Sequence, residues 1–331
     1  MKNSVRHEIL KHGMLWALFV LIWPFALVNW ASAKPLIIEK GVIQCDTTWA
    51  NEVFVKGDVE VAQGATLIVM PGTVVKFAKI EDNGPANLYM DKTKNFTRAE
   101  LIVSGRILAQ GTKDKMIVFT SAEKSPHVAD WGAINMLDRE NNILEYCDIS
   151  YAHTSVHSHG AQFTLANCYV HDNGVAVGFK NVDECKPRCV NILYNRISNN
   201  GGGVLSSKDS IATISHNEIS HNKFFGVYGK KATSVNVRYN NIVHNGKGII
   251  LWATQGFRIS ENNISDSEDY NVSLLEGQVW DLDVRNNWWG ITDRKEIRKL
   301  MWDKEQDATL GSIDFSHYSL SPIEGAGIPG E

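Results

Sequence analysis

The stretch "VRYNNIVHNG" (residues 237–246) places two asparagines, Asn240 and Asn245, around one apolar residue, Ile242. Similar stretches begin at Ile214 ("ISHNEISHNK"), Ile192 ("ILYNRISNNG") and Leu165 ("LANCYVHDNG"). The fourth position of this pattern recurs seven times, 21 to 27 residues apart, at Cys147, Cys168, Asn195, Asn217, Asn240, Asn262 and Asn287. A period near 22 residues that persists over seven copies is typical of a repeat architecture.

Each copy contains three short stretches in which apolar and polar residues alternate. In one copy these are Val235–Val237, Asn240–Ile242 and Gly248–Leu251, separated by asparagine and glycine. Alternation predicts strands, and the frequent glycine and asparagine residues disfavour helices. Three short strands per coil of about 22 residues, with each coil stacked on the next, predict an all-β parallel β-helix.

The recurring asparagines have a structural explanation in such a fold. Equivalent residues of successive coils lie about 4.8 Å apart, so stacked side-chain amides can donate to one neighbour and accept from the other. Asparagine also tolerates the left-handed backbone conformation of a sharp corner. We therefore expect Asn240 and Asn245 to mark two corners and to form ladders.

The start of the chain predicts export. The basic segment "MKNSVRHEILKHG" precedes 17 mostly apolar residues and the small-residue site Ala31-Ser32-Ala33, which together are typical of a signal peptide over residues 1–33. An uncleaved anchor is the alternative, but 17 residues interrupted by Pro24 are short for a membrane span of about 20. We expect an exported protein, periplasmic, cell-surface or extracellular, with no membrane span after cleavage.

The remaining boundaries follow from the pattern. We predict an N-terminal cap over residues 34–57, the parallel β-helix over 58–290 with a projecting polar loop at 79–98, and a C-terminal cap over 291–331. The cap contains an amphipathic helix within 293–304 and the closing strand "IDFSHYSL". Capping is needed because an open solenoid end exposes unpaired strands. The net charge of −4 gives no electrostatic reason to expect a nucleic-acid partner.

The cysteines suggest disulfides, which an oxidising compartment permits. Cys147 and Cys168 occupy the ladder position on successive coils, within disulfide reach, so they either bridge two coils or stack as buried thiols. Cys185 and Cys189 could staple a local loop. Because Cys45 makes the total five, at least one thiol is free or pairs between chains.

Longer motifs carry a resemblance to a family. The stretches "VEVAQGATLIVMPGTVVKF" (59–77), "LIVSGRILAQGT" (101–112), "WGAI" (131–134) and "NNWWG" (286–290), with the Asn repeats, resemble bacterial exported β-helix proteins of the pectin-lyase-like superfamily, including the periplasmic NosD-like group. The resemblance covers about residues 40–320. It implies right-handed winding and a carbohydrate-related function, although fold alone does not determine activity.

Two columns of corner residues could bind a glycan. The residues before the ladder positions include Tyr194, His216, Tyr239 and Glu261, and those before the second asparagine include His221, His244 and Asp266. Tyrosine with mixed hydrogen-bonding groups at a regular rise suits an extended, periodic polysaccharide. The alternative is that solvated corners simply tolerate these residues.

A polysaccharide lyase or C5-epimerase acting on uronans is the first alternative function. Such an enzyme would need several carboxylates for Ca²⁺, which takes six to eight oxygen ligands. The outward column after the ladder position reads Asp148, Tyr169, Arg196, Glu218, Asn241 and Asn263, so no three carboxylates stack. We expect no cofactor unless the protein is lyase-like, and no evident catalytic site.

Two further groups of residues are candidates. Leu205, Tyr228, Ile250 and Trp252 should face outward and could form an apolar surface for a protein partner, unless a neighbouring segment covers them.

In "AHTSVHSHG", strand alternation puts His157 and His159 on one side, where imidazole suits Zn²⁺ or Cu²⁺. Two ligands are fewer than a metal site needs. The sequence thus predicts an exported β-helix that binds a polysaccharide or cell-surface glycan, with an enzyme or an assembly module as the alternatives.

Overall fold

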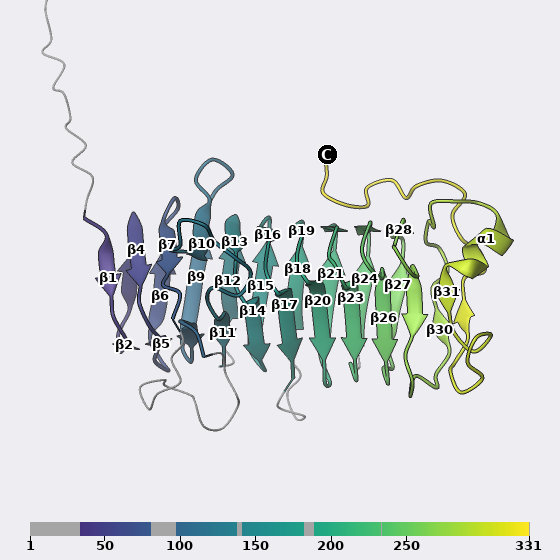
Figure 1. Cartoon of the computed structure of the whole chain (residues 1–331), viewed down its shortest axis with the longest axis horizontal. Helices are drawn as coiled ribbons and strands as arrows, with labels where there is room; N and C mark the ends of the chain where they lie inside the picture. The colour runs from purple at the N-terminus through teal and green to yellow at the C-terminus, as the bar shows by residue number, and fades with distance from the viewer. Residues whose placement is uncertain (1–33, 81–96, 138–140, 182–188, 233, 331) are drawn as a thin grey trace, which may run out of the picture. The chain divides into compact units, whose positions relative to one another are not determined.

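The computed structural model describes residues 34–80, 97–137, 141–181, 189–232 and 234–330. The predicted signal peptide, most of the 79–98 loop and Cys185 lie outside these residues. Three parallel sheets of 10, 11 and 9 strands run along the molecule, and up to β29 each strand pairs with the strand three positions before it or after it in the chain. The chain therefore completes one coil for every three strands. The predicted all-β parallel β-helix is confirmed (Figure 1).

The strands are short. Sheet A contains β1 (Leu36–Ile38), β4 (Glu52–Val55), β7 (Val74–Phe77), β10 (Ile117–Ser121), β13 (Cys147–Ser150), β16 (Tyr169–His171), β19 (Arg196–Ser198), β22 (Glu218–Ser220), β25 (Asn241–Val243) and β28 (Asn263–Ser265). Sheet B contains β2 (Gly41–Ile43), β5 (Val59–Val61), β8 (Leu101–Val103), β11 (Ile134–Met136), β14 (Thr154–His159), β17 (Val175–Lys180), β20 (Gly202–Ser207), β23 (Phe225–Lys230), β26 (Ile249–Trp252), β29 (Val272–Leu274) and β31 (Met301–Trp302). Sheet C contains β3 (Thr47–Trp49), β6 (Thr66–Val69), β9 (Arg106–Gln110), β12 (Asn141–Glu145), β15 (Gln162–Ala166), β18 (Cys189–Leu193), β21 (Ile211–Ser215), β24 (Ser234–Arg238) and β27 (Phe257–Ser260).

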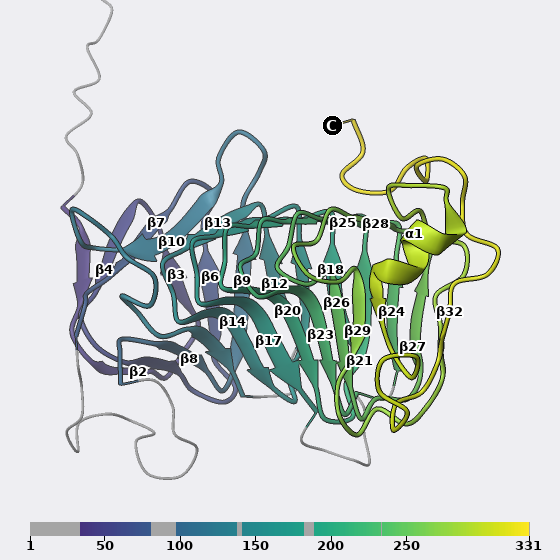
Figure 2. The same cartoon turned by 45° about the vertical axis from the view of Figure 1, so that its right-hand side comes forward.

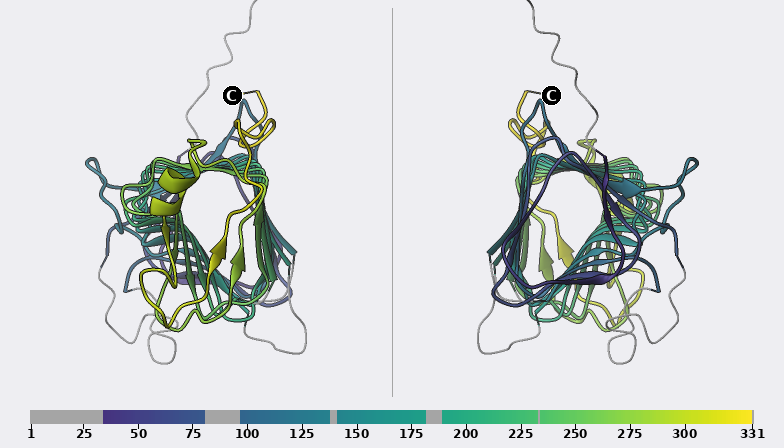
Figure 3. Two further views of the ribbon diagram at one scale, coloured as in Figure 1. Left: turned by 90° about the vertical axis from the view of Figure 1, so that its right-hand side faces the viewer. Right: turned by 90° about the vertical axis from the view of Figure 1, so that its left-hand side faces the viewer.

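The core lies inside the coils, between the three sheets (Figure 3). Ile219, Ile242 and Ile264 pair in register on sheet A and are fully buried. On sheet C, Val235 and Val237 are buried, whereas Asn236 between them is half-buried on the outer side. The period of two in the sequence is therefore the alternation between core and surface.

Two asparagine ladders run along the corners at the two ends of the sheet A strands. The first contains Asn195, Asn217, Asn240, Asn262 and Asn287, and the second contains Asn173, Asn200, Asn222 and Asn245. In the first ladder, Asn240 Nδ2 donates to Asn262 Oδ1 at 3.0 Å and to the Ile214 carbonyl at 2.8 Å. Asn240 Oδ1 accepts from both the backbone and side-chain nitrogens of Asn217. The predicted ladder role is confirmed.

The left-handed backbone conformation at the corners was predicted for the ladder asparagines, but another residue adopts it. Positive φ falls on the residue before each ladder position: Tyr146 (48°), Asn167 (55°), Tyr194 (58°), His216 (57°), Tyr239 (53°) and Glu261 (60°). The second row behaves alike, for example at His221 (56°) and His244 (55°). The backbone turns one residue early because the asparagine side chain itself points into the core. The expectation that asparagine takes the left-handed corner is therefore wrong at most coils.

No disulfide is formed among the cysteines that the structure describes, and Cys185 lies outside them. Cys147, Cys168 and Cys189 are free thiols. Cys168 takes a ladder position, because its Sγ accepts from the Cys147 backbone N–H at 3.3 Å and its own N–H donates to Asn195 Oδ1 at 2.9 Å. Burial, together with the adjacent Cys168, raises the pKa of Cys147 well above its ordinary value, so this thiol stays protonated. The stacked-thiol alternative holds for this pair.

The C-terminal end contains a short helix, α1 (Arg294–Lys299), which lies at the end of the strand stack (Figure 2). Asp293 caps it by accepting the Lys295 and Glu296 backbone N–H groups, and Ile297 is fully buried. The helix is shorter than the predicted segment 293–304. The closing strand is β32 (Ile313–Asp314), which pairs with β30 (Leu282–Asp283), and residues 34–57 contain β1–β4. Among the described residues, no helix is long and apolar enough to cross a membrane.

Candidate functional site

Three of the predicted glycan-binding residues form a stack of rings at one corner. Tyr194 and His216 lie 5.0 Å apart between ring centroids, His216 and Tyr239 lie 5.1 Å apart, and the interplanar angles are 28° and 18°. Tyr239 Oη donates to Glu261 Oε1 at 2.7 Å, which extends the row by one coil. The structure therefore brings these four residues together, but the ring faces stack on one another. Both faces of the His216 ring are therefore occupied, whereas the face of Tyr194 that points away from His216 makes no recorded ring contact among the described residues.

The second predicted row lies at the other end of the sheet A strands. His221 and His244 are 5.1 Å apart between ring centroids, and Asp266 follows on the next coil, where it accepts from Ser265 Oγ at 2.6 Å. The sheet A strands, for example β22 and β25, lie between this histidine row and the ring stack of Tyr194, His216 and Tyr239. The two rows are therefore separate surfaces and do not form a single strip.

Sheet A offers no carboxylate cluster for Ca²⁺ in its outward column. Asp148 and Glu218 are separated by Tyr169 and Arg196 in the strand register. Asp148 is engaged with His171, and Glu218 accepts from Asn241 Nδ2 at 2.9 Å. The strand register therefore places these four residues in one column, in the order that the sequence predicted.

The sequence did not indicate His171, which bridges two carboxylates. Its Nε2 donates to Asp148 Oδ1 at 3.0 Å and its Nδ1 to Asp172 Oδ2 at 2.6 Å, and Tyr169 stacks on the ring at 4.0 Å. Burial opposes protonation, but the hydrogen bonds to Asp148 and Asp172 outweigh it and raise the pKa of His171 above its ordinary value. The imidazolium form is therefore favoured in the folded protein.

This arrangement predicts a pH-dependent contribution to stability. Because the pKa of His171 is raised on folding, its contribution is complete below the unfolded-state pKa of about 6.5 and is lost as pH rises through the folded-state pKa. We expect His171→Gln to lower the free energy of unfolding by about 1–2 kcal/mol at pH 5.5. The difference from wild type should shrink towards pH 8.5. Urea unfolding at both pH values measures it, and a difference that grows with pH contradicts the assignment.

The predicted partner surface is contiguous but only partly exposed. Leu205, Tyr228 and Ile250 pair in register on the outer face of sheet B, and Trp252 lies beside them. Ile250 is 8% exposed, and Lys230 and Lys231 place their Nζ atoms 4.9 and 5.0 Å from the Trp252 ring. These lysines make the edge of the surface cationic. A protein partner at this surface stays a prediction.

His157 and His159 form a close pair on the same outer face. Both project from β14, their Nε2 atoms are 3.3 Å apart and their rings meet edge to face. Burial and the neighbouring His159 lower the pKa of His157 to about 3, and burial and Lys180 lower the pKa of His159 to about 4. Both imidazoles are therefore neutral at physiological pH and able to act as ligands. Among the residues that the structure describes, no group of three or more His, Cys, Asp or Glu side chains could hold a metal ion.

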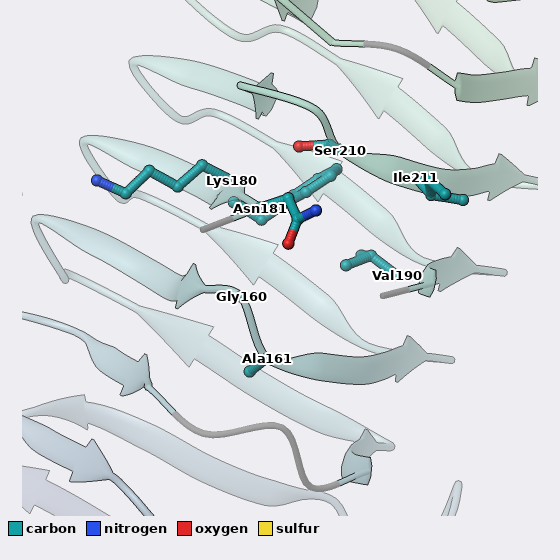
Figure 4. Close-up of a pocket in the computed structure, with 8 residues that line it drawn as sticks. Gly160, Ala161, Lys180, Asn181, Val190, Ser210 and Ile211 are labelled. Carbon is teal, nitrogen blue, oxygen red and sulfur yellow. The ribbon is translucent and has the colours of Figure 1, made fainter. Parts of the chain in front are cut away.

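The surroundings of the histidine pair combine buried polar groups with open space. In register with His157, the preceding coil has the fully buried Asn135 and the following coil has Gly178. A hollow of about 160 Å³ extends over Gly178 and is lined by Lys180 and Leu205, among others. A second hollow, at the end of β17, measures about 10 Å³ (Figure 4). That volume holds at most one water molecule, so this second hollow is too small for an organic ligand.

A larger cleft lies at the open end of the ring stack. It measures about 610 Å³ and is lined by Lys113, Met116, Tyr146, Asn167, Cys168, Tyr169, Tyr194, Arg196, Ile328, Pro329 and Gly330. The C-terminal segment forms one wall because it returns along sheet A (Figure 1). It is held by hydrogen bonds from Ile323 N to Asn263 Oδ1 at 2.7 Å and from Gly327 N to the Tyr239 carbonyl at 2.9 Å. Of the predicted glycan-binding residues, Tyr194 alone lines this cleft.

Comparison with sequence families gives two matches. The family described as "Periplasmic copper-binding protein (NosD)" matches residues 113–290, and the family described as "Pectate-lyase like beta helix domain" matches residues 41–160. Comparisons with curated proteins and with solved structures return no match. The two matched regions together span the coils that carry both the histidine pair and most of the cleft.

Proposed function

The chain belongs to the family described as periplasmic copper-binding protein (NosD), and we propose that it binds copper through His157 and His159. The family is periplasmic, so the expectation of an exported protein is confirmed. The observation that carries the proposal is the 3.3 Å separation of the two Nε2 atoms. The family is described as copper-binding, and this histidine pair supplies two nitrogen ligands of the kind that copper accepts.

The separation fits a shared metal ion. Two imidazole nitrogens that each lie about 2.0–2.1 Å from a tetrahedral metal, the geometry typical of Zn²⁺, are about 3.3–3.4 Å apart, and the closer spacing of a tetragonal Cu²⁺ site would need a small shift of the two rings. Without a metal ion, the same contact is a hydrogen bond between the two rings, in which one Nε2 donates and the other accepts. Imidazole is a suitable ligand for copper. The residues present therefore fit two ligand positions of a copper site.

The strand geometry holds the pair in place. β14 is paired on both sides, with β11 and β17, so the Cα positions of both histidines are fixed by the sheet. Gly178, beside His157, has no side chain to close the approach. The neutral imidazoles require no deprotonation before binding. Two ligands from the chain leave the other coordination positions to water or an exogenous ligand, which suits exchangeable binding of copper.

Lys180 opposes the binding of a cation. It follows His159 in the strand register and its charge contributes to the lowered pKa of both histidines. We therefore expect moderate affinity, and we expect Lys180→Gln to strengthen copper binding. This variant separates electrostatic tuning from ligation, because it changes the field at the pair and leaves both imidazoles in place.

Copper titration of the purified protein tests the proposal. We expect one equivalent of Cu²⁺ to bind, with an electron paramagnetic resonance spectrum that shows nitrogen ligands. His157→Asn and His159→Asn should each weaken binding by at least about tenfold, an effect no smaller than that of losing an outer-shell partner of a ligand. His317→Asn is the matched control, because His317 is an exposed histidine distant in sequence and its left-handed backbone (φ 55°) tolerates asparagine. Unchanged affinity in both pair variants, with normal thermal unfolding, contradicts the proposal.

A further inference from the structure

We propose that Asn135 and Glu100 position His157 for copper: Asn135 accepts a hydrogen bond from Nδ1–H of His157, and Glu100 fixes the direction of the Asn135 amide. The inference rests on the proposed function, and it names two residues that act through a ligand without contacting the metal. Three observations support it: two buried side chains whose polar atoms lack hydrogen bonds, their place beside His157 in sheet B, and the orientation of the His157 ring.

Asn135 and Glu100 are buried polar residues on the outer side of sheet B. Asn135 lies on β11 between Ile134 and Met136, which both point into the core, so its own side chain points outward. Asn135 and Glu100 are nevertheless fully buried. Among the described residues, no hydrogen bond of normal geometry reaches the Asn135 amide or either carboxyl oxygen of Glu100. Buried polar groups without hydrogen bonds are uncommon and costly, so these atoms need an explanation beyond packing.

The strand register brings both residues to the histidine pair. Asn135 pairs in register with His157 on one side and with Ile102 on the other. Glu100, two residues before Ile102, is therefore a diagonal neighbour of Asn135, within reach of a long side chain. Burial and the charge of Asp58 raise the pKa of Glu100 well above its ordinary value, whereas the neighbouring Asn135 amide lowers it. The side chains thus form a row from Glu100 through Asn135 to His157.

The orientation of the His157 ring turns Nδ1 towards Asn135. His157 lies between Asn135 on β11 and Gly178 on β17. A Cβ atom at Gly178 would lie 3.6 Å from Cδ2 of His157, so the Cδ2 edge of the ring faces β17. Nδ1 lies on the opposite edge of the imidazole ring and therefore faces β11. Nε2 is left to meet Nε2 of His159, at 3.3 Å.

The proton on Nδ1 decides whether Nε2 can bind a metal. A neutral imidazole carries one proton, so a proton held on Nδ1 leaves the lone pair of Nε2 available for copper. An amide can present either its oxygen or its NH₂ group to Nδ1, and only the oxygen selects this tautomer. Glu100 sets the direction, because a carboxyl group, charged or not, keeps an oxygen that accepts from Asn135 Nδ2 and so turns Oδ1 towards His157. We expect these contacts to reach normal hydrogen-bond geometry when the rings make the small shift that a tetragonal Cu²⁺ site needs.

The tautomer of His157 gives a test that needs no copper. Long-range ¹H–¹⁵N NMR of the metal-free protein shows which ring nitrogen carries the proton. We expect the proton on Nδ1 of His157 in wild type and a mixture of tautomers in Asn135→Leu, which keeps a similar size and removes both polar groups of the amide. A proton on Nε2 of His157 in wild type, or an unchanged tautomer in Asn135→Leu, would overturn the inference.

Copper affinity and stability should change in different ways in Asn135→Leu. The apolar side chain removes a buried group that lacks a hydrogen bond, so the melting temperature of the metal-free protein should be unchanged or higher. Cu²⁺ binding should weaken by at least about tenfold, as is usual when a ligand loses its outer-shell partner. A purely structural role of Asn135 predicts the reverse, a lower melting temperature with unchanged affinity.

Ser273→Ala is the matched control for this variant. Ser273 lies in the same outer column of sheet B, far along the coils on β29, and it is 2% exposed. Its hydroxyl group likewise makes no hydrogen bond among the described residues. The substitution therefore removes the same kind of group at a distance from the pair, and it should leave the copper affinity and the His157 tautomer unchanged.

Two substitutions test the part played by Glu100. Glu100→Gln keeps an oxygen that accepts from Asn135 Nδ2, so it should bind copper like wild type, whereas Glu100→Met should weaken binding by about tenfold. If wild type and His157→Asn bind copper equally, the proposed function fails and this inference fails with it. If binding requires both histidines but is the same in Asn135→Leu as in wild type, this inference alone is wrong.

Discussion

Replacing Asn240 by alanine is expected to lower the free energy of unfolding by at least about 3 kcal/mol. The substitution removes three donated hydrogen bonds, to the Asn262 side chain and to the Ile214 and Arg238 carbonyls. It also leaves the backbone and side-chain nitrogens of Asn217 without the oxygen that accepts from them. A buried polar group that loses its partner costs about 1–3 kcal/mol. Because the losses occur on two coils, we expect them to exceed the cost of one hydrogen bond.

The control for this prediction lies on the same coil. Asn236 is half-buried on the outer side of sheet C and belongs to neither ladder, so Asn236→Ala should cost less than about 1 kcal/mol. Urea unfolding of both variants, followed by far-ultraviolet circular dichroism, gives the comparison. Equal destabilisation by the two substitutions would show that the ladder contributes no more than an ordinary surface asparagine.

The fold could be predicted from the sequence because the same pattern of apolar and polar residues recurs in every coil. The inward positions around Ile242 recur in each coil, and a period of two within a period of 22 allows few other structures. The ladder followed from this, since a buried asparagine that recurs at each level needs a partner above and below. A structural feature that recurs in every coil can be predicted from several copies of the repeat, so an atypical residue in one copy does not obscure it.

Features that break the repeat were not predictable in the same way. The cleft depends on Asn167 interrupting a row of rings and on Ile328 and Pro329 folding back from the far end of the chain. Nothing periodic connects these segments. The bridging of His171 by Asp148 and Asp172 also depends on side-chain direction, which the sequence pattern does not specify.

For Cys147 and Cys168 the disulfide alternative is wrong and the stacked-thiol alternative is correct, for a related reason. Register alone places Cys147 and Cys168 on neighbouring coils, and that much was correct. The side chains, however, take the ladder's hydrogen-bonding role, and Cys168 Sγ accepts a backbone N–H where an asparagine oxygen would do so. Proximity between Cα atoms is thus necessary for a bridge but does not determine which partner the sulfur contacts.

The second large effect is expected at Trp131, in the "WGAI" stretch that carried part of the family resemblance. Trp131 is fully buried, its ring stacks on Phe77 with centroids 4.2 Å apart and planes within 5°, and its Nε1 donates to the Ser150 carbonyl at 2.8 Å. Trp131 therefore links three successive coils, through its ring contact with Phe77 and its hydrogen bond to Ser150. Trp131→Ala should lower the free energy of unfolding by about 3–5 kcal/mol, the usual cost of truncating a large aromatic core residue.

The location of this loss should be as informative as its size. In a solenoid each coil contacts only its neighbours, so hydrogen exchange should accelerate in β7, β10 and β13, around Phe77 and Ser150, and much less in β24–β28. Trp280→Ala is the matched control, because Trp280 is 42% exposed and should cost less than about 1 kcal/mol. If Trp131→Ala instead accelerated exchange uniformly along all three sheets, the coils would unfold as a single cooperative unit. Local packing around Trp131 could then not be separated from the stability of the asparagine ladders far along the chain.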